Sequence, residues 1–337
     1  MKKLLTILLT ILLTTLLIIT GCNSDVSNSQ PINKTGFYFD TVISITLYDK
    51  DKEYLIDECF DICEKYENLF SKTIAYSDIS IINSANGNAV SVNKDTTELL
   101  SRGLYYSSLT KGYFDITIGA LSELWNFSDN NASPREDDIL KCISTVDYNL
   151  VTIDNDYVTI KNPDTKIDVG GIAKGYVADK LKNYLLENDV KSGIIDLGGN
   201  VLLIGSKPDN SNYNIGIAKP FSKNGDTIAV VRTNDKSIVT SGNYQRYFYD
   251  NNTLYHHILD PHTGYPINNS LNSVTIISDK SIDGDALSTS CFALGITDGM
   301  KLIESIEGVE AIFVDDKNNI TLSDGLNLND NVITLSY

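Results

Sequence analysis

A strand is predicted to pass into a helix at Asp168-Val-Gly-Gly-Ile-Ala-Lys-Gly-Tyr-Val-Ala-Asp179. The strand covers residues 166–169, and the helix runs from about residue 173 to residue 188. Glycines at such a junction let backbone N–H groups approach an anion, and the helix N-terminus favours negative charge. The spacing fits neither the Walker A loop nor the Gly-x-Gly-x-x-Gly turn of the dinucleotide fold. The junction therefore predicts either a phosphate site or a plain tight turn.

The rest of the chain groups its strands and helices instead of alternating them. Residues 37–48 are a predicted first strand, residues 150–160 a hairpin around Asn155-Asp156, and residues 193–204 two strands joined at Gly198-Gly199. The C-terminal part is mostly strand runs between Asn, Asp and Gly turns. Helical periodicity occurs at residues 52–69, 96–109, 137–146, 285–294 and 299–306. This grouping predicts an α+β fold with largely antiparallel sheets and a few packed helices.

The first residues predict where the protein resides. A basic start, Met1-Lys-Lys3, precedes an apolar run and then Ile19-Thr20-Gly21-Cys22, which is typical of a secretory signal followed by a lipobox. We expect residues 1–21 to be a lipoprotein signal peptide, with Cys22 lipidated as the mature N-terminus. Residues 22–35 would be a flexible tether and residues 36–337 the folded domain. The protein would then be anchored by lipid to the cell membrane, on its extracytoplasmic face. The alternative is a transmembrane anchor with a chance cysteine.

Charge restricts the partners of the folded part. The 337-residue chain has a formal net charge of −17, which becomes about −19 once the two signal-peptide lysines are removed. Such a charge argues against binding nucleic acid or an anionic membrane surface. An anionic ligand would need local capture by a metal ion, a helix N-terminus or glycine-rich backbone.

All three histidines lie close together in Tyr255-His-His-Ile-Leu-Asp-Pro-His-Thr-Gly-Tyr-Pro266. Imidazole is the side chain best suited to proton transfer near neutral pH, so acid–base chemistry by histidine must occur here. The prolines and Gly264 predict a rigid loop, where catalytic groups often lie. A surface turn with solvated imidazoles is the alternative.

A second candidate site begins the predicted helix at Asp283-Gly-Asp-Ala-Leu-Ser-Thr-Ser290. Asp285 and Thr289 are four residues apart, so a carboxylate and a hydroxyl share one helix face. Oxygen donors of this kind suit Mg²⁺. Asp285 could instead be a helix cap and Thr289 a core residue.

Seven motifs occur in order over residues 37–294: Phe114-Asp-Ile-Thr-Ile-Gly119, Leu124-Trp125, Asp168-Val-Gly-Gly-Ile-Ala-Lys-Gly-Tyr176, Gly198-Gly-Asn200, Ser241-Gly-Asn-Tyr244, His257-Ile-Leu-Asp-Pro-His-Thr-Gly264 and Asp285-Ala-Leu-Ser-Thr289. Together they resemble the ApbE family, the FAD:protein FMN transferases. The resemblance implies an ApbE-like fold and an Mg²⁺-dependent enzyme. Such an enzyme transfers the FMN moiety of FAD to a Thr or Ser hydroxyl of an acceptor flavoprotein and releases AMP.

The resemblance also implies roles for single residues. His257 would be the catalytic base. Metal ligands would be Ala173, through its backbone carbonyl, Asp285 and Thr289, with Ser288 adjacent. Flavin contacts would come from Phe39, Thr73, Tyr113, Phe114, Asp115, Gly170, Tyr176 and Leu259.

Two other functions stay open at this point. With water as acceptor, the same site would make the protein an FAD pyrophosphatase that yields FMN and AMP. Without chemistry, it would be an FAD-binding surface lipoprotein. The paired Mg²⁺ ligands and His257 favour an enzyme, because storage needs no general base. The sequence contains no evident acceptor domain, so the acceptor, an extracytoplasmic flavoprotein, would be modified in trans.

Overall fold

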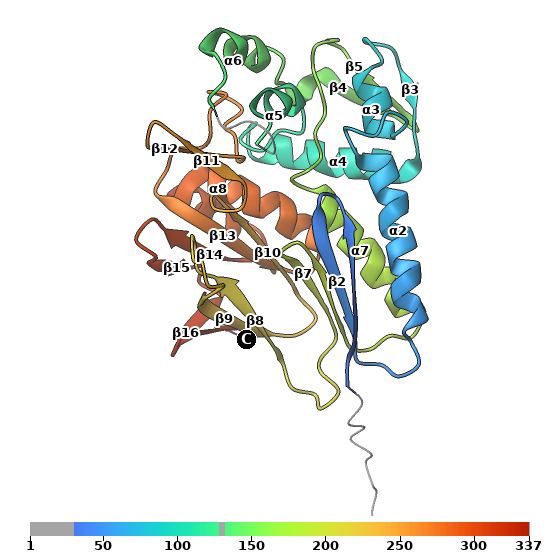
Figure 1. Cartoon of the computed structure of the whole chain (residues 1–337), viewed down its shortest axis with the longest axis vertical. Helices are drawn as coiled ribbons and strands as arrows, with labels where there is room; N and C mark the ends of the chain where they lie inside the picture. The colour runs from blue at the N-terminus through green and yellow to red at the C-terminus, as the bar shows by residue number, and fades with distance from the viewer. Residues whose placement is uncertain (1–29, 128–131, 337) are drawn as a thin grey trace, which may run out of the picture. The chain divides into compact units, whose positions relative to one another are not determined.

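The structure, a computed structural model, describes residues 30–127 and 132–336. One sheet of eight strands runs through them, and Figure 1 shows its central strands. Every neighbouring pair of strands in this sheet is antiparallel. In sheet order, the strands are β1 (Ile32–Tyr38), β2 (Thr41–Leu47), β6 (Gly193–Leu197), β7 (Asn200–Ile204), β10 (Ser237–Gly242), β13 (Leu271–Ser278), β14 (Glu310–Asp315) and β15 (Ile320–Leu322).

The prediction of a single strand at residues 37–48 is wrong in one respect, because these residues belong to the hairpin of β1 and β2. Phe39 and Asp40 form the turn, with φ of 54° and 56°. Two central residues with positive φ suit the right-handed twist of a tight hairpin, but Asn and Gly normally fill these positions, so the sequence gives no turn signal. β1 begins at Ile32, before the boundary predicted at residue 36.

A second sheet covers one face of the first. It contains β16 (Leu326–Asn329), β17 (Val332–Leu335), β9 (Thr227–Thr233) and β8 (Tyr213–Ala218), with β17 parallel to β9. Apolar residues of both sheets, such as Ile277 and Val231, form one core between them. All eight residues of β13 are buried, since β13 has this core on one side and helices on the other.

Two helices pack on the other face of the main sheet, α7 (Ala173–Glu187) and α8 (Ser281–Glu304). α8 is interrupted at Gly295, which agrees with the two predicted helices. It begins earlier than predicted because the Asp179 carboxylate of α7 accepts hydrogen bonds from the backbone N–H groups of Ser281 and Ile282, at 2.8 and 3.0 Å. Asp285 therefore lies inside the helix, and the interpretation of Asp285 as its cap is wrong.

The remaining helices and short strands lie mainly at the upper end of Figure 1, with α2 along the right side. β4 and β5 form the hairpin predicted around Asn155-Asp156. The elements are α2 (Tyr54–Phe70), α3 (Asp78–Asn83), β3 (Val90–Ser91), α4 (Lys94–Leu109), α5 (Gly119–Trp125), α6 (Glu136–Ile143), a 3-10 turn (Tyr148–Leu150), β4 (Val151–Asp154), β5 (Tyr157–Ile160), β11 (Tyr247–Asp250) and β12 (Thr253–His256).

The strand predicted at residues 166–169 is not formed. The side chain of Asn83 binds both backbone groups of Ile167: its Nδ2 donates to the carbonyl and its Oδ1 accepts from the N–H. A side chain thus replaces a neighbouring strand, and only Lys166 makes an isolated bridge. Apart from these differences, the mixed architecture confirms the predicted α+β class.

No helix within residues 30–127 or 132–336 is long and apolar enough to span a membrane. The predicted signal peptide and Cys22 lie outside the described residues.

Candidate functional site

The carboxylate of Asp168 holds the junction before α7. Its Oδ2 accepts hydrogen bonds from Lys72 Nζ and Ser122 Oγ, both at 2.7 Å, and its Oδ1 accepts one from Gly170 N at 2.8 Å. Burial raises the pKa of Asp168, but the Lys72 ammonium and the hydrogen bonds outweigh burial and keep the pKa below its ordinary value. Gly170 is thereby fixed in an exposed position at the N-terminal end of α7.

A glycine allows α7 and α8 to approach closely. A Cβ atom at Gly175 would lie 2.3 Å from the carbonyl oxygen of Ser281 and 2.7 Å from Cα of Ile282. The close approach also lets Gly175 N donate a 2.9 Å hydrogen bond to Asp285 Oδ2. The segments that carry two of the predicted metal ligands, Ala173 and Asp285, are thus brought together.

Hydroxyl groups surround the same part of α8. Ser241 Oγ, from β10, lies 2.8 Å from Ser288 Oγ and 3.2 Å from Thr289 Oγ1. Thr289 also faces Gly171, since a Cβ atom there would lie 3.8 Å from its Oγ1.

These residues fit a magnesium ion. One buried carboxylate with hydroxyl and carbonyl oxygens is a set of hard donors that leaves positions for water or phosphate, as Mg²⁺ prefers. Within the described ranges, no group of three or more His, Cys, Asp or Glu side chains is placed to hold a metal ion.

Lys174 was not predicted as a site residue but lies beside two residues that were, Asp285 and Gly170. Its Nζ is 3.6 Å from Asp285 Oδ1 and 3.5 Å from the carbonyl oxygen of Gly170. Its positive charge also contributes to the lowered pKa of His257. Lys174 therefore lies between the glycine-rich junction and the Asp285 carboxylate.

His257 follows β12 and is half-buried. Its backbone N–H donates to the carbonyl of Arg246 at 3.1 Å, and its Nδ1 has no hydrogen-bond partner among the described residues. Burial lowers the pKa of His257 to about 3, and nearby positive charges, including Arg246 and Lys174, add to the shift. His257 is therefore neutral at physiological pH, the protonation state that a general base requires.

The other two histidines have evident structural partners. The buried His256 places Nε2 3.0 Å from the carbonyl oxygen of Ile267, and burial lowers its pKa to about 4. The more exposed His262 has Nδ1 3.2 Å from Asp260 Oδ1 and its ring 4.7 Å from that of Tyr113. Of the three histidines, which all lie in the described part of the chain, only His257 has a buried ring nitrogen without a partner.

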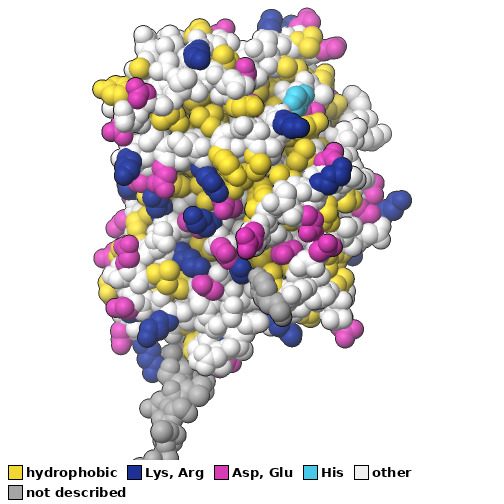
Figure 2. Space-filling view, turned by 180° about the vertical axis from the view of Figure 1, so that it is seen from behind, with side chains coloured by type: hydrophobic (Ala, Val, Ile, Leu, Met, Phe, Trp, Pro, Cys, Tyr) yellow, Lys and Arg dark blue, Asp and Glu magenta, His cyan; other side chains and the backbone are white. Residues whose placement is uncertain are grey.

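The predicted flavin contacts fall into two groups. Phe39, Thr73, Tyr113 and Gly170 are at least partly exposed and can meet a ligand. Figure 2 shows a band of hydrophobic side chains across the upper half of one face, with a histidine and basic side chains near it.

Phe114, Asp115, Tyr176 and Leu259 are buried. The Asp115 carboxylate accepts hydrogen bonds from Thr117 and from the backbone of Tyr148, while burial raises its pKa. Through these hydrogen bonds, Asp115 stabilises the loops that contain Thr117 and Tyr148.

Tyr176, at 3% exposure, packs edge-on against Tyr66 and Phe70, and its hydroxyl lies 2.8 Å from Glu98 Oε2. Leu259 belongs to an apolar cluster with Trp125. Tyr176 and Leu259 therefore pack in the protein interior. Their predicted contacts with the flavin stay predictions.

A pocket of about 470 Å³ lies beside the histidine loop, lined by Asp40, Phe127, Gln245, Arg246 and Tyr247. Its volume is in the range of small-molecule sites. Sequence reasoning missed all five lining residues. The only available signal was that Gln245-Arg246-Tyr247 directly follows the Ser241-Gly-Asn-Tyr244 motif.

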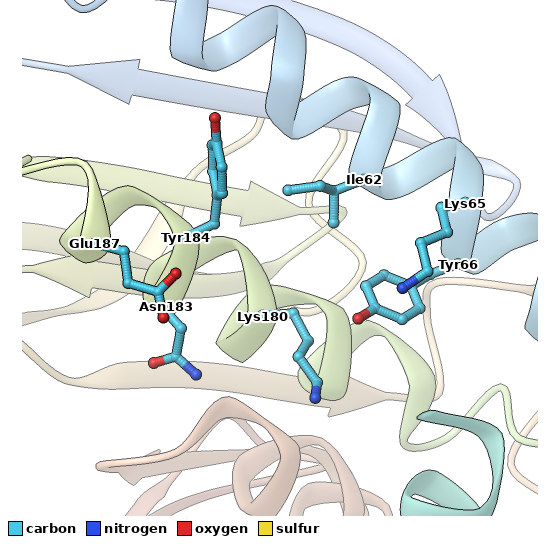
Figure 3. Close-up of a pocket in the computed structure, with 7 residues that line it drawn as sticks. All are labelled: Ile62, Lys65, Tyr66, Lys180, Asn183, Tyr184 and Glu187. Carbon is cyan, nitrogen blue, oxygen red and sulfur yellow. The ribbon is translucent and has the colours of Figure 1, made fainter. Parts of the chain in front are cut away.

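Another pocket, of about 370 Å³, lies between α2 and α7 (Figure 3). It contains none of the predicted site residues. Lys65 and Lys180, which line it, are paired with Asp95. We interpret this pocket as a groove between two packed helices.

Residues 39–313 match the model of the ApbE family, and the chain belongs to this family. It is 34% identical over 302 residues to the FAD:protein FMN transferase of Klebsiella pneumoniae (strain 342), covering 88% of this chain and 93% of that protein. The FAD:protein FMN transferase of Treponema pallidum (strain Nichols) is 31% identical over 308 residues, covering 85% of each.

Solved structures agree with this assignment. The ApbE protein from Thermotoga maritima has a TM-score of 0.81 at 31% identity, covering 88% of this chain and 97% of its own. The flavinyl transferase ApbE from Pseudomonas stutzeri has a TM-score of 0.78 at 27% identity, covering 88% and 95%. The predicted ApbE-like fold is confirmed.

Proposed function

We propose that this protein is an FAD:protein FMN transferase that uses Mg²⁺ and an acceptor hydroxyl of Thr or Ser. Family membership and relatives of that name, similar over most of their length, support flavin transfer. The observation that carries the proposal is the contact of Asp285 with the N-terminal end of α7, where Gly175 N donates to its Oδ2 and Lys174 Nζ lies 3.6 Å from its Oδ1.

The site supplies what a diphosphate needs in an acidic protein. The exposed backbone at Gly170 and the N-terminal end of α7 attract negative charge. Lys174 and Arg246 add positive charge near His257. We expect the diphosphate of FAD to bind between these groups.

Asp285, Ser288, Thr289 and the carbonyl of Ala173 would hold Mg²⁺, which supplies neutralisation of charge on the diphosphate and on departing AMP. Lys174 would then move from Asp285 towards a phosphate oxygen.

His257 acts on the acceptor hydroxyl. Its neutral imidazole takes the proton as the hydroxyl oxygen attacks the phosphorus on the FMN side of FAD. A new P–O bond joins FMN to the acceptor, the P–O bond to AMP breaks, and AMP departs with the electron pair. The negative charge of bound FAD would raise the pKa of His257 and make it a stronger base.

One incubation separates this function from its alternatives. The full chain in detergent is mixed with FAD, Mg²⁺ and extracytoplasmic proteins of the same membrane. Covalent flavin fluorescence on a protein band supports transfer. Free FMN and AMP without a labelled band support FAD hydrolysis, and unchanged FAD supports a binding protein.

We further propose that Cys22 carries the lipid anchor and that the protein works on the extracytoplasmic face of the cell membrane. The basic start, apolar run and lipobox-like residues before Cys22 support this location. The acceptor would be a flavoprotein exposed at the same face.

A further inference from the structure

The β11–β12 ribbon leads directly into the candidate base. β12 ends at His256, the residue before His257, and Tyr247 at the start of β11 pairs with His256. Arg246, the residue before β11, accepts the backbone N–H of His257. A ligand lying along β11 would therefore reach His257 at one end of the strand.

The ribbon has unpaired strand edges. β11 and β12 pair only with each other among the described strands, so each has an outer edge without a neighbouring strand. Proteins usually shorten, cover or charge such edges, because exposed backbone groups accept further strands. An extended peptide can add to such an edge by main-chain hydrogen bonds, with alternate side chains giving specificity.

Aromatic side chains follow this ribbon on its outer face. Along β11, Phe248 is buried while Tyr247 and Tyr249 are 41% and 60% exposed. The ring of Tyr247 lies 5.8 Å from that of Tyr249 and 5.5 Å from that of Phe221, which is 38% exposed in the β8–β9 loop. We call Phe221, Tyr247 and Tyr249 the aromatic strip. Phe221 also has a φ of 55°, which is uncommon for a bulky side chain.

The aromatic strip is continuous with the candidate site. Tyr247 belongs both to the strip and to the pocket that Arg246 and Asp40 line. Exposed tyrosines form large contacts with little loss of conformational entropy and are common in protein interfaces. Because the strip follows a strand that begins beside His257, it suits an extended polypeptide acceptor.

We propose that the acceptor protein docks here, through an extended segment that pairs with the β11 edge and crosses the aromatic strip, so that its Thr or Ser hydroxyl reaches His257. This inference rests on the proposed function. In this proposal, binding of the acceptor to the ribbon makes a protein hydroxyl, and not water, the group that attacks FAD.

The test uses the full chain in detergent and the protein that the wild-type chain labels with flavin, purified in unlabelled form. Phe221→Ala and Tyr249→Ala are the variants. Tyr157→Ala is the matched control, because Tyr157 is a similarly exposed tyrosine on a strand, at 53%, outside the aromatic strip. The KM for the acceptor, the Kd for FAD and FAD hydrolysis without acceptor are measured for each.

We expect each strip variant to raise the acceptor KM about tenfold, the typical loss of an interface anchor, with FAD binding and hydrolysis changed less than about twofold. The control should match the wild type. An acceptor KM unchanged in both strip variants would overturn the docking proposal. A loss of FAD binding in parallel would also overturn it, because the strip would then be part of the FAD site.

Two further measurements identify the molecule that binds to the ribbon. A synthetic peptide from the labelled region should compete with the acceptor, and N-methylation of its backbone should weaken that competition if strand pairing holds it. Concentration-dependent dimers of the wild-type chain that Tyr249→Ala abolishes would instead assign the ribbon to a second copy. If the wild-type chain labels no protein, the proposed function itself fails.

Discussion

The His257→Ala substitution gives the sharpest test of the candidate site. Removing a general base typically lowers a rate by about 10²–10⁴-fold while leaving ground-state binding largely intact. We therefore expect FMN transfer nearly to disappear and FAD still to bind. The more exposed His262 provides the control, since His262→Ala should retain substantial activity.

The structure also changes the expected pH dependence. The sequence alone predicts an acidic limb near pH 6–7, the ordinary range of histidine, but burial lowers the pKa of His257 to about 3. A lowered pKa means that the neutral base persists as the pH falls and is lost only near the new pKa. At pH 5, an ordinary histidine of pKa 6.5 would be about 3% neutral and the rate about 30-fold lower, whereas a pKa of about 3 leaves about 99% neutral.

The assay is kcat/KM for FAD between pH 4 and pH 8, which reports the free enzyme. Transfer is followed by fluorescence of the acceptor in a gel. A flat profile from pH 7 to pH 5 is expected for the wild type. A limb centred near pH 6.5 would refute the burial argument, and an active His257→Ala enzyme would refute the base assignment, leaving Asp260 or a metal-bound water as the base.

Four further outcomes follow from the structure. Asp285→Asn should abolish Mg²⁺-dependent transfer and weaken Mg²⁺-dependent FAD binding, and a chelator should have the same effects on the wild type. Unchanged wild-type activity with excess chelator would exclude the metal site. Unfolding of the variant would point to a structural role for Asp285. Gly175→Ala forces a Cβ atom to within 2.3 Å of the carbonyl of Ser281, so we expect denaturant unfolding to show a loss of about 1–3 kcal/mol or more. Burial lowers the pKa of His256 from 6.5 to about 4, so protonation of this group should cost the folded state up to about 3 kcal/mol as the pH falls from 7 to 4. A folded His256→Gln variant should lack this contribution and keep the separate one from His257, whose pKa is also lowered. Cys22→Ala should prevent lipidation without changing the folded domain; a mature mass and membrane attachment identical to the wild type would contradict the anchor.

Local patterns predicted much of the fold because they depend on nearby residues. The helical periods at residues 52–69 and 173–188 correspond to α2 (Tyr54–Phe70) and α7 (Ala173–Glu187). The start of α8 could not be predicted in this way. Its cap, Asp179, comes from another helix 102 residues away from Ser281.

In the candidate site too, features that depend on neighbouring residues could be predicted, and features that depend on distant residues could not. Helical spacing placed Asp285 and Thr289 on one face, and the structure places them by the α7 junction. Lys174 was missed because nothing local distinguishes it from a surface lysine. The pKa of His257 was also beyond sequence reasoning, since burial and distant charges determine it.

The complete burial of β13 has a consequence for how the molecule opens. One strand contributes side chains to both cores, so neither core can separate without exposing the other to water. Amide hydrogens of β13 should therefore exchange with solvent only through unfolding of the whole domain. Ser241 and Thr289 lie on its immediate neighbours, β10 and α8, and their positions should persist when no ligand is bound. The catalytic residues would then already be arranged in the folded protein, and ligand binding would not have to arrange them at each turnover.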